Sequence, residues 1–299
     1  MNAIEIRNLS KSFRGMYAVD HLNMTVPVGA IYGFIGENGS GKSTTEKLIC
    51  GHLVPDGGEI TLFGKDYTDA GVRVRVGALI ENAGCFPGSS VWNNLMMQAI
   101  NLGLEEPEQE IERVLKIVRM EDSARIKFKS CSLGMKQRIG IAMALLGDPA
   151  LLILDEPING LDTDGMRIMR EILVDITQTY GCTVLISSHI LGELEKIATH
   201  YGIIREGRMI QEISAKEMES RARVFVSVKT QDMQGAKEVL KTLGKVKEEE
   251  GYLRIYDVDD PERVVELLYQ NGHIVSEVKK NKIGLEEYYV ELMSKKEDE

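Results

Sequence analysis

Apolar residues follow two different patterns along the chain. In some short segments nearly every residue is apolar, as at positions 31–35 and 151–154. Such runs are typical of strands buried on both faces of a parallel sheet. In longer segments, such as 111–118 and 135–146, apolar residues recur at helical spacing. Buried strands that alternate with such helices predict an α/β fold.

The pattern changes in the last quarter of the chain, where shorter amphipathic elements follow one another. We expect a strand at 224–228, a helix at 236–243, a hairpin around Gly251, a helix at 264–268, a strand at 273–278 and a final helix from Leu285. The resulting βαββαβ order resembles a small α+β ferredoxin-like module. A rigid cap that stabilises the first domain is one interpretation of this module.

The distribution of charge supports a division of the chain. Of the 79 residues from Arg221 to Glu299, 31 are charged, against 51 among the first 220. Such a shift of composition is typical of a boundary between two units. We therefore expect one domain over 1–218 and a second domain over 219–299.

Net charge and hydropathy exclude several classes of protein. The formal net charge of −10 argues against a general nucleic-acid binder, because binding to phosphates needs clustered Lys and Arg. No stretch reaches about 18 unbroken apolar residues, the length that a spanning helix needs. The opening residues also lack the apolar core of a signal peptide. We expect a cytoplasmic protein.

The strongest motif follows the apolar run at 31–35. Residues 36–44 read GENGSGKST and match G-x-x-x-x-G-K-[ST] between a strand and a helix. Glycines let backbone N–H groups curl around an anion, and the helix adds its positive end. The lysine and the serine after the last glycine favour a phosphate loop over a plain turn. The candidate nucleotide-binding residues are Gly36, Asn38, Gly39, Ser40, Gly41, Lys42, Ser43 and Thr44.

Two adjacent carboxylates end the second apolar run. Asp155 and Glu156 follow residues 151–154, at the carboxyl end of a predicted parallel strand, where such sheets bind ligands. Asp155 and Ser43 are candidate Mg²⁺ ligands, and Glu156 is placed to activate a water molecule. The alternative is a helix cap beside a solvated acid, which we would favour if the chain had no phosphate loop.

With these motifs the chain resembles the ATP-binding subunit of an ABC transporter, a phosphate-loop ATPase. Residues 132–138 resemble the signature segment of that family, and residues 159–162 resemble its D-loop. His189 follows another apolar strand, as the switch histidine of the family does, and Phe13 stands in the place of the aromatic residue that stacks on adenine. These features occur in the family's order over about residues 1–215. The resemblance implies subunit contact or regulation for the module that follows, as the alternative to a stabilising cap.

The resemblance implies ATP and Mg²⁺ as ligands and two ATPase subunits arranged head to tail, expected to be a homodimer. Ser132 and Gly134 would then contact the γ-phosphate bound to the opposite subunit, and His189 and Lys42 would act in catalysis. From the residues alone, Ser132 could equally cap a helix, His189 could be structural, and Phe13 could fill the core.

One position departs from the family. Where the family carries the glutamine of its Q-loop, this chain has Glu81, whose carboxylate could ligate Mg²⁺ and act in catalysis. The same substitution is familiar in the bacitracin-resistance and lantibiotic-immunity exporters, which the chain therefore resembles. An ordinary solvated acid is the alternative for Glu81.

A helical subdomain is expected at about 83–146. In the family, this insert and the Q-loop form a groove that receives a helix of the membrane subunit. The candidates for lining the groove, each of which could instead pack in the core, are Cys85, Phe86, Pro87, Val91 and Trp92.

The predicted function is thus an ATPase that drives a separate membrane permease from the inner face of the cell membrane. The expected cargo is a peptide antibiotic, drug or lipid-like compound, and the expected direction is export. The alternative is a soluble ABC-type ATPase acting on DNA or ribosomes, which the acidic charge and the single phosphate loop disfavour. A small-molecule kinase would not require the signature segment, the D-loop or His189.

Overall fold

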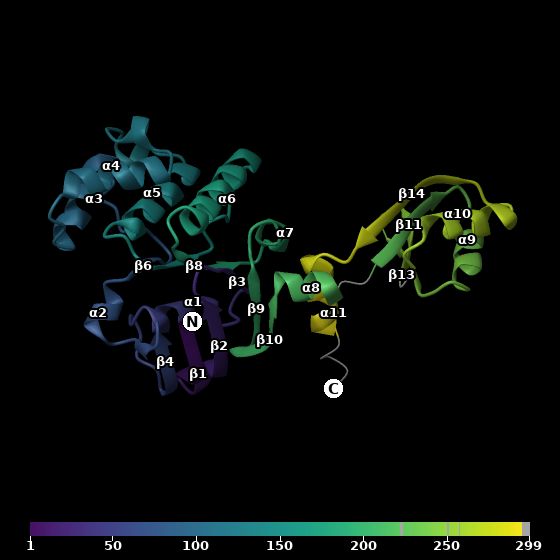
Figure 1. Cartoon of the computed structure of the whole chain (residues 1–299), viewed down its shortest axis with the longest axis horizontal. Coiled ribbons are helices and arrows are strands. Elements are labelled where there is room, and N and C mark those ends of the chain that lie inside the picture. The colour runs from purple at the N-terminus through teal and green to yellow at the C-terminus, as the bar shows by residue number, and fades with distance from the viewer. Residues whose placement is uncertain (222–223, 250, 257, 295–299) are drawn as a thin grey trace. The chain divides into compact units, whose positions relative to one another are not determined.

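The structure is a computed structural model that describes residues 1–221, 224–249, 251–256 and 258–294. The chain divides into two compact units, Met1–Ala215 and Lys216–Glu299 (Figure 1). We treat each unit by itself. Within the described ranges, no helix combines the length and the apolar composition that crossing a membrane requires.

A six-stranded sheet forms the centre of the first unit. Its strand order is β10-β9-β3-β8-β7-β6, and every neighbouring pair except β10 and β9 is parallel. All residues of β3 and the first four of β7 are buried, as their apolar runs predicted. The strands are β3 (Ile31–Ile35), β6 (Val76–Leu79), β7 (Leu151–Asp155), β8 (Thr183–Ser188), β9 (His200–Arg205) and β10 (Arg208–Ser214).

The first unit also contains an antiparallel sheet, and residues of both sheets belong to one hydrophobic core. Ile4 and Ile6 of the antiparallel sheet, Phe34 of β3, and Leu48 and Ile49 of the first helix belong to this cluster. The elements are β1 (Asn2–Phe13), β2 (Met16–Pro27), β4 (Gly57–Leu62), β5 (Lys65–Asp66) and α1 (Lys42–Ile49). The core therefore fixes α1 and β3, the two elements that flank the phosphate loop.

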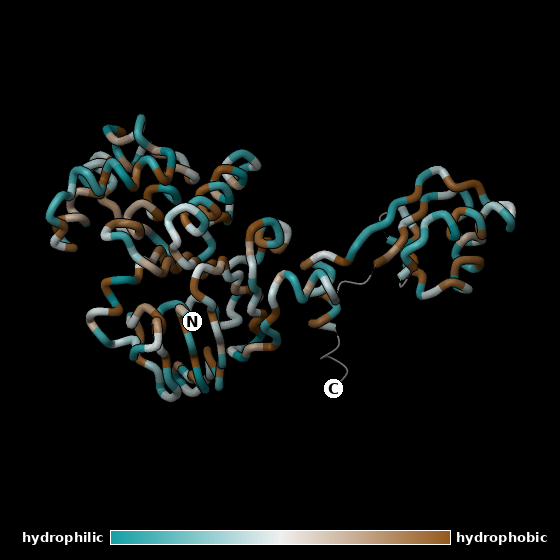
Figure 2. The backbone as a smooth tube through the Cα atoms, viewed as in Figure 1, coloured by the Kyte–Doolittle hydropathy of each residue, from teal (hydrophilic) through white to brown (hydrophobic). Residues whose placement is uncertain are grey.

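Three helices form a group of their own in the first unit (Figure 1). They are α3 (Val91–Asn101), α4 (Pro107–Ile117) and α5 (Leu133–Leu145). Hydrophobic and hydrophilic residues alternate along these helices (Figure 2), and the apolar positions predicted to share one face, Ile111, Val114, Leu115 and Val118, are all buried. Helix α5 begins two residues before the expected position 135. The other α-helices that lie wholly in the unit are α2 (Ala70–Arg73), α6 (Thr163–Gln178) and α7 (Leu191–Leu194), and two short 3-10 helices span Glu121–Ser123 and Phe128–Ser130.

The second unit has the βαββαβ order that its apolar pattern predicted. Its antiparallel sheet has the order β12-β13-β11-β14, and Val226, Val228, Leu253 and Leu268 belong to its separate core. The last strand lies later than the expected 273–278. After α8 (Ala215–Arg221), the elements are β11 (Val224–Thr230), α9 (Met233–Leu240), β12 (Val246–Glu249), β13 (Tyr252–Tyr256), α10 (Pro261–Gln270), β14 (Val275–Lys282) and α11 (Leu285–Ser294).

Candidate nucleotide-binding site

The phosphate loop joins the end of β3 to the start of α1, and two of its glycines have no room for a side chain. A Cβ atom on Gly36 would lie 2.6 Å from the carbonyl oxygen of Ile204, and one on Gly41 would lie 2.4 Å from that of Ala18. Gly41 also has a φ of 108°, a conformation that side chains disfavour. Tight packing against neighbouring backbone thus explains the glycines and keeps the loop closely curled.

Lys42 places its ammonium group inside this loop. The side chain is 6% exposed, and Nζ donates hydrogen bonds to the carbonyl oxygens of Gly36 and Glu37, at 2.7 and 3.1 Å. The hydroxyl of Ser40 is buried and has no hydrogen-bond partner among the described residues. A buried donor without a partner fits an anionic ligand, as the motif predicts. Of the remaining loop residues, Asn38 and Gly39 are exposed, and Ser43 and Thr44 are half-buried.

Ser187, at the end of β8, connects the two adjacent carboxylate residues. Its hydroxyl donates a hydrogen bond of 2.9 Å to Oδ1 of Asp155 and accepts one of 3.1 Å from the backbone N–H of Glu156. Glu156 has a φ of 49°, which is uncommon for a residue with a side chain and is often found at functional sites. The two carboxylates have different partners, since Ser187 donates to Asp155 and His189 donates to Glu156.

Glu156 lies between His189 and Lys42. The imidazole Nδ1 of His189 is 2.8 Å from Oε2 of Glu156, so this nitrogen donates to the carboxylate. The other oxygen, Oε1, is 3.8 Å from Nζ of Lys42 and has no hydrogen-bond partner in the described part of the chain. Residues from three separate segments thus meet at one carboxylate, which retains capacity to accept a proton or a hydrogen bond.

The signature segment begins helix α5. The Oγ atom of Ser132 accepts a hydrogen bond of 3.3 Å from the backbone N–H of Met135, so this serine is the N-cap of the helix. Ser132 remains exposed and Gly134 half-exposed. Over the residues that the structure describes, no hydrogen bond or ion pair joins Ser132 to Lys42 or Glu156. Ser132 is thus not bonded to these two candidate catalytic residues within the described part of one chain.

Phe13 and Glu81 also lie apart from the carboxylate pair. Phe13 ends β1 and is 44% exposed, with Nζ of Lys11 5.6 Å from its ring centroid, so this ring does not fill the core. Oε1 of Glu81 is 2.6 Å from Nζ of Lys47 on α1. The hydrogen bond and the charge of Lys47 lower the pKa of the Glu81 carboxyl. The structure thus pairs Glu81 with a lysine rather than with Asp155.

The sequence reasoning missed Glu46. This residue is fully buried on α1, and neither of its carboxyl oxygens has a hydrogen-bond partner within the described ranges. Burial, followed by the charge of Asp155, raises the pKa of the Glu46 carboxyl well above its ordinary value. Its position four residues after Lys42, which puts both on one helix face, was the available signal. Ser187 was also missed, as an ordinary polar residue in a strand.

A cleft of about 460 Å³ lies between the segment that follows β6 and helix α5. Cys85 and Pro87, two of the predicted groove residues, line this cleft. Val91 is instead fully buried in the helical group, and Phe86 is 61% exposed. The cleft is thus bordered both by the segment of Glu81 and by the helix that Ser132 caps.

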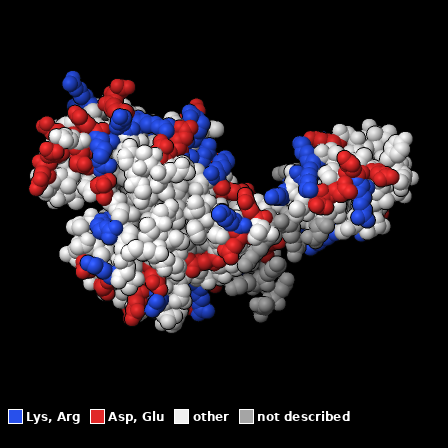
Figure 3. All heavy atoms as spheres, viewed as in Figure 1, with Lys and Arg blue, Asp and Glu red and all other residues white. Residues whose placement is uncertain are grey.

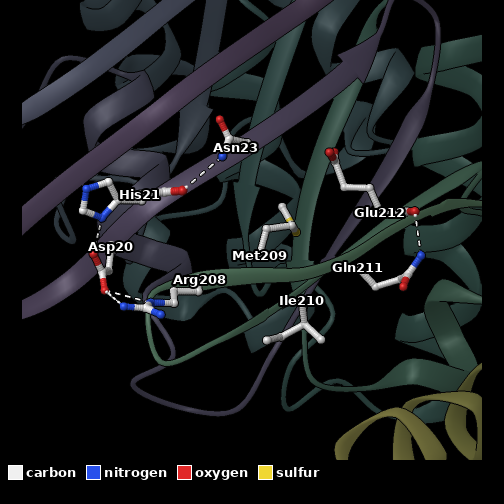
Figure 4. A pocket seen from close by; sticks show the side chains of 8 residues that line it. All are labelled: Asp20, His21, Asn23, Arg208, Met209, Ile210, Gln211 and Glu212. Carbon is white, nitrogen blue, oxygen red and sulfur yellow. Dashed lines mark hydrogen bonds and ion pairs between the residues drawn. The ribbon is translucent and has the colours of Figure 1, made fainter. Parts of the chain in front are cut away.

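A second cavity, of about 540 Å³, lies where β2 packs against β10 (Figure 4). Asp20 pairs there with both Arg208 and His21, and Glu212 accepts a hydrogen bond from the hydroxyl of Tyr32. None of the residues that line this cavity belongs to the phosphate loop or the carboxylate pair, and we assign no ligand to it.

The oxygen atoms that Ser43 and Asp155 offer suit a cation that is bound by phosphate oxygens as well. Hydroxyl and carboxylate oxygens, such as those of Ser43 and Asp155, are the ligand types that Mg²⁺ prefers. No three acidic, histidine or cysteine side chains in the described part of the chain are arranged to hold a metal ion by themselves. Water and phosphate oxygens would therefore have to complete the coordination, as is usual for Mg²⁺ bound with a nucleotide.

Comparison with known proteins gives consistent matches. Residues 19–159 match the family described as ABC transporter. The bacitracin transport ATP-binding protein BcrA of Bacillus licheniformis is 34% identical over 297 residues, 97% of each chain. The lantibiotic transport ATP-binding protein SrtF of Streptococcus pyogenes is 38% identical over 209 residues, 70% of this chain and 90% of SrtF. The solved structure of cbiO1 from Clostridium perfringens, part of the ABC transporter complex cbiONQ, has a TM-score of 0.67 at 28% identity and covers 74% of this chain and 91% of its own.

The alignment with BcrA covers nearly the whole chain and so includes residues of the second unit. Both curated relatives are named as transport proteins, which supports a transporter subunit over an ATPase acting on DNA or ribosomes. The phosphate loop, the carboxylate pair and these matches agree. The chain belongs to the ABC transporter family, in which it is an ATP-binding and ATP-hydrolysing subunit.

Proposed function

We propose that two copies of this chain bind two Mg·ATP between them and that hydrolysis drives a separate membrane permease. The observation that carries this proposal is the meeting of Lys42, Glu156 and His189 beside a glycine loop that is closed to side chains. Lys42 provides a positive charge that binds phosphate, Glu156 accepts a proton, and His189 orients Glu156.

The chain's own residues divide the reaction among them. The N–H groups of the loop and Lys42 bind the β- and γ-phosphates. Mg²⁺, held by Ser43 and Asp155, would neutralise charge on the phosphates. Glu156 orients the attacking water and accepts its proton at Oε1, which accepts no hydrogen bond within the described residues, while His189 holds Oε2 and fixes the carboxylate. Phe13 offers an exposed ring for the adenine.

The exposure of the signature segment supports a dimer. Ser132 and Gly134 lie at the N-terminus of α5, where backbone N–H groups and the helix dipole favour an anion. Within the described part of its own chain, no hydrogen bond or ion pair joins Ser132 to Lys42 or Glu156, so we assign the phosphate that Ser132 binds to a second copy. Each active site is therefore complete only in the dimer.

The cleft beside α5 is the proposed contact with the permease. Glu81 and the signature segment both border the cleft, so a permease helix bound there would be displaced when either of them moves. The names of BcrA and SrtF favour a bacitracin-like or lantibiotic-like peptide as cargo and export as the direction. The chain would then lie in the cytoplasm, at the inner face of the membrane. Because Glu81 is paired with Lys47, it could reach the metal site only if the segment that follows β6 moved.

The variant Lys42→Ala tests the nucleotide site. Loss of a charge-assisted contact weakens binding by at least about tenfold, which calorimetric titration with ATP would measure. Lys65→Ala on the exposed strand β5 removes the same charge and should bind ATP normally. Wild-type affinity in Lys42→Ala would contradict the assignment of the loop.

Purification of the chain from detergent-extracted membranes tests the transport role. A hydrophobic subunit should co-purify in a fixed ratio to this chain. Substitution of Cys85 by a bulky, charged residue in the cleft should release that subunit and leave ATP binding intact. Association with ribosomes or DNA in place of a membrane protein would overturn the proposed coupling.

A further inference from the structure

We propose that Arg170 is a positioning residue of the hydrolysis site, which acts through an ion pair with Glu193 on the backbone segment that carries His189. This inference rests on the proposed role of His189 beside Glu156. Arg170 lies outside the phosphate loop, the carboxylate pair, the signature segment and the D-loop, so no motif assigns it a role.

The side chain of His189 depends on its backbone for support. It is 43% exposed, and in the described part of the chain the contact with Glu156 is the one hydrogen bond that its imidazole makes. On either side of His189, the hydroxyl of Ser188 accepts a hydrogen bond of 2.9 Å from the N–H of Ile190. The direction of the imidazole therefore follows from where β8 ends and where α7 begins.

Helix α7, which follows His189 by two residues, is too short to be stable by itself. It has four residues, and isolated helices shorter than about 12 residues are marginal in water. Leu194 at its end is fully buried, and a Cβ atom on Gly33 of β3 would lie 3.3 Å from Cδ1 of this leucine. Contacts with other elements must therefore hold α7 in place, and the contact of Leu194 is one of them.

Glu193 connects α7 to helix α6. Its Oε2 atom is buried and forms an ion pair with Nη1 of Arg170, while its Oε1 atom is 2.6 Å from Nζ of Lys196. The side chains of Glu193 and Arg170 are only 14% and 21% exposed. A largely buried ion pair contributes little net stability, because both charges lose their hydration. What this pair provides is one fixed place for α7 against α6.

Helix α6 is a firm base for this ion pair. It has 16 residues and contacts both β3 and β8, and Met169 and Leu173, on either side of Arg170 in the sequence, are buried. Strand β8 leads directly to His189, so the base and the histidine are supported by the same sheet. Loss of the ion pair should therefore leave the sheet intact and release α7 together with the segment of His189.

The test measures kcat and KM for ATP hydrolysis by the full chain. In Arg170→Ala we expect kcat to fall about tenfold, within the roughly 10²-fold loss that a displacement of about 1 Å can cause, and KM to stay unchanged. Arg170→Lys, which keeps a positive charge for Glu193, should recover part of kcat. Glu193→Gln breaks the same ion pair, should lower kcat equally, and replaces Arg170→Ala if that variant does not fold.

The matched control is Arg167→Ala. Arg167 lies one turn earlier on α6, is 52% exposed and pairs with Asp164 and Glu171 of the same helix. Its removal takes the same charge from α6 without breaking the connection to α7, so kcat should stay at the wild-type value. A lower melting temperature of Arg170→Ala with unchanged kcat would mean that Arg170 is merely structural, which would overturn the inference.

Combination with His189→Ala decides whether Arg170 acts through His189. Without the imidazole, Arg170→Ala should cause no further fall in kcat, whereas independent effects would multiply. A multiplied loss would overturn the inference. If kcat falls in His189→Ala but not in Arg170→Ala, the role of Arg170 is wrong and the proposed role of His189 stands. If His189→Ala keeps the wild-type kcat, the proposed role of His189 is wrong, and this inference is wrong with it.

Discussion

At the residue scale, the site depends on one side chain at the end of each of three segments. Lys42 begins α1, Glu156 follows β7 and His189 follows β8. Because β7 and β8 are parallel neighbours, their carboxyl ends lie at the same edge of the sheet. A short contact between Glu156 and His189 is therefore a consequence of the topology, although the sequence motifs placed the two residues only after separate apolar strands and did not predict the contact.

His189 is expected to position Glu156 rather than to bind ATP tightly. His189→Ala should lower kcat by about 10²-fold or more, because the carboxylate loses the donor that orients it. ATP affinity in calorimetry should stay at the wild-type value, and His189→Asn, which retains a donor, should recover part of kcat. Equal turnover in His189→Ala and the wild type would show that the contact has no role in catalysis.

Other residues at this scale could not be predicted from sequence. The phosphate loop and the carboxylate pair have motifs because their chemistry requires fixed residue types at fixed spacing. The ion pair of Glu81 with Lys47 joins residues 34 positions apart and depends on how α1 lies against the segment after β6. Glu46 belongs to no motif, and only the packing of α1 against β7 shows that its carboxyl is buried.

At the element scale, the apolar pattern predicted the buried strands well because burial on both faces leaves few alternatives. The apolar pattern predicted the first and last residues of helices and strands less well. Helix α5 begins at Leu133 because Ser132 caps it, two residues before the apolar repeat becomes visible. Strand β14 extends to Lys282, beyond the apolar positions, since its later residues are paired with β11 by backbone bonds that the side chains do not indicate.

The connection between β3 and α1 should depend on Gly41. In Gly41→Ala, the left-handed backbone alone costs about 1–2 kcal/mol, and the new Cβ would meet the carbonyl oxygen of Ala18 at 2.4 Å. We expect a lower melting temperature and weaker ATP binding. Gly57→Ala is the matched control, because its Cβ would meet nothing within 4 Å. If Gly41→Ala and Gly57→Ala have the same melting temperature, the loop is less constrained than the structure indicates.

At the scale of the whole molecule, each unit buries hydrophobic residues of its own, and the candidate nucleotide site belongs to the first unit. The phosphate loop and the carboxylate pair all lie in Met1–Ala215, and the second unit has its own buried cluster. Acidic and basic side chains are interspersed on the face of the molecule shown in Figure 3. This face therefore offers anions no broad basic surface, in contrast to the positive charge that Lys42 provides in the phosphate loop.

Thermal unfolding should reflect this division. We expect two calorimetric transitions, because each unit buries its own hydrophobic cluster. AMP-PNP with Mg²⁺ at a hundred times Kd should stabilise the first unit by about 2.7 kcal/mol, and the second transition should stay where it is. A single transition that moves as a whole on adding nucleotide would contradict independent units.

The central claim is that Glu156 accepts the proton from the water that attacks ATP. The most direct measurement is steady-state ATP hydrolysis by Glu156→Gln, which preserves the shape of the side chain and removes its basicity. The account predicts that kcat falls by about 10²–10⁴-fold, that ATP binding persists, and that an ATP-dependent dimer becomes long-lived in size-exclusion chromatography. Hydrolysis at the wild-type rate by this variant would contradict the account.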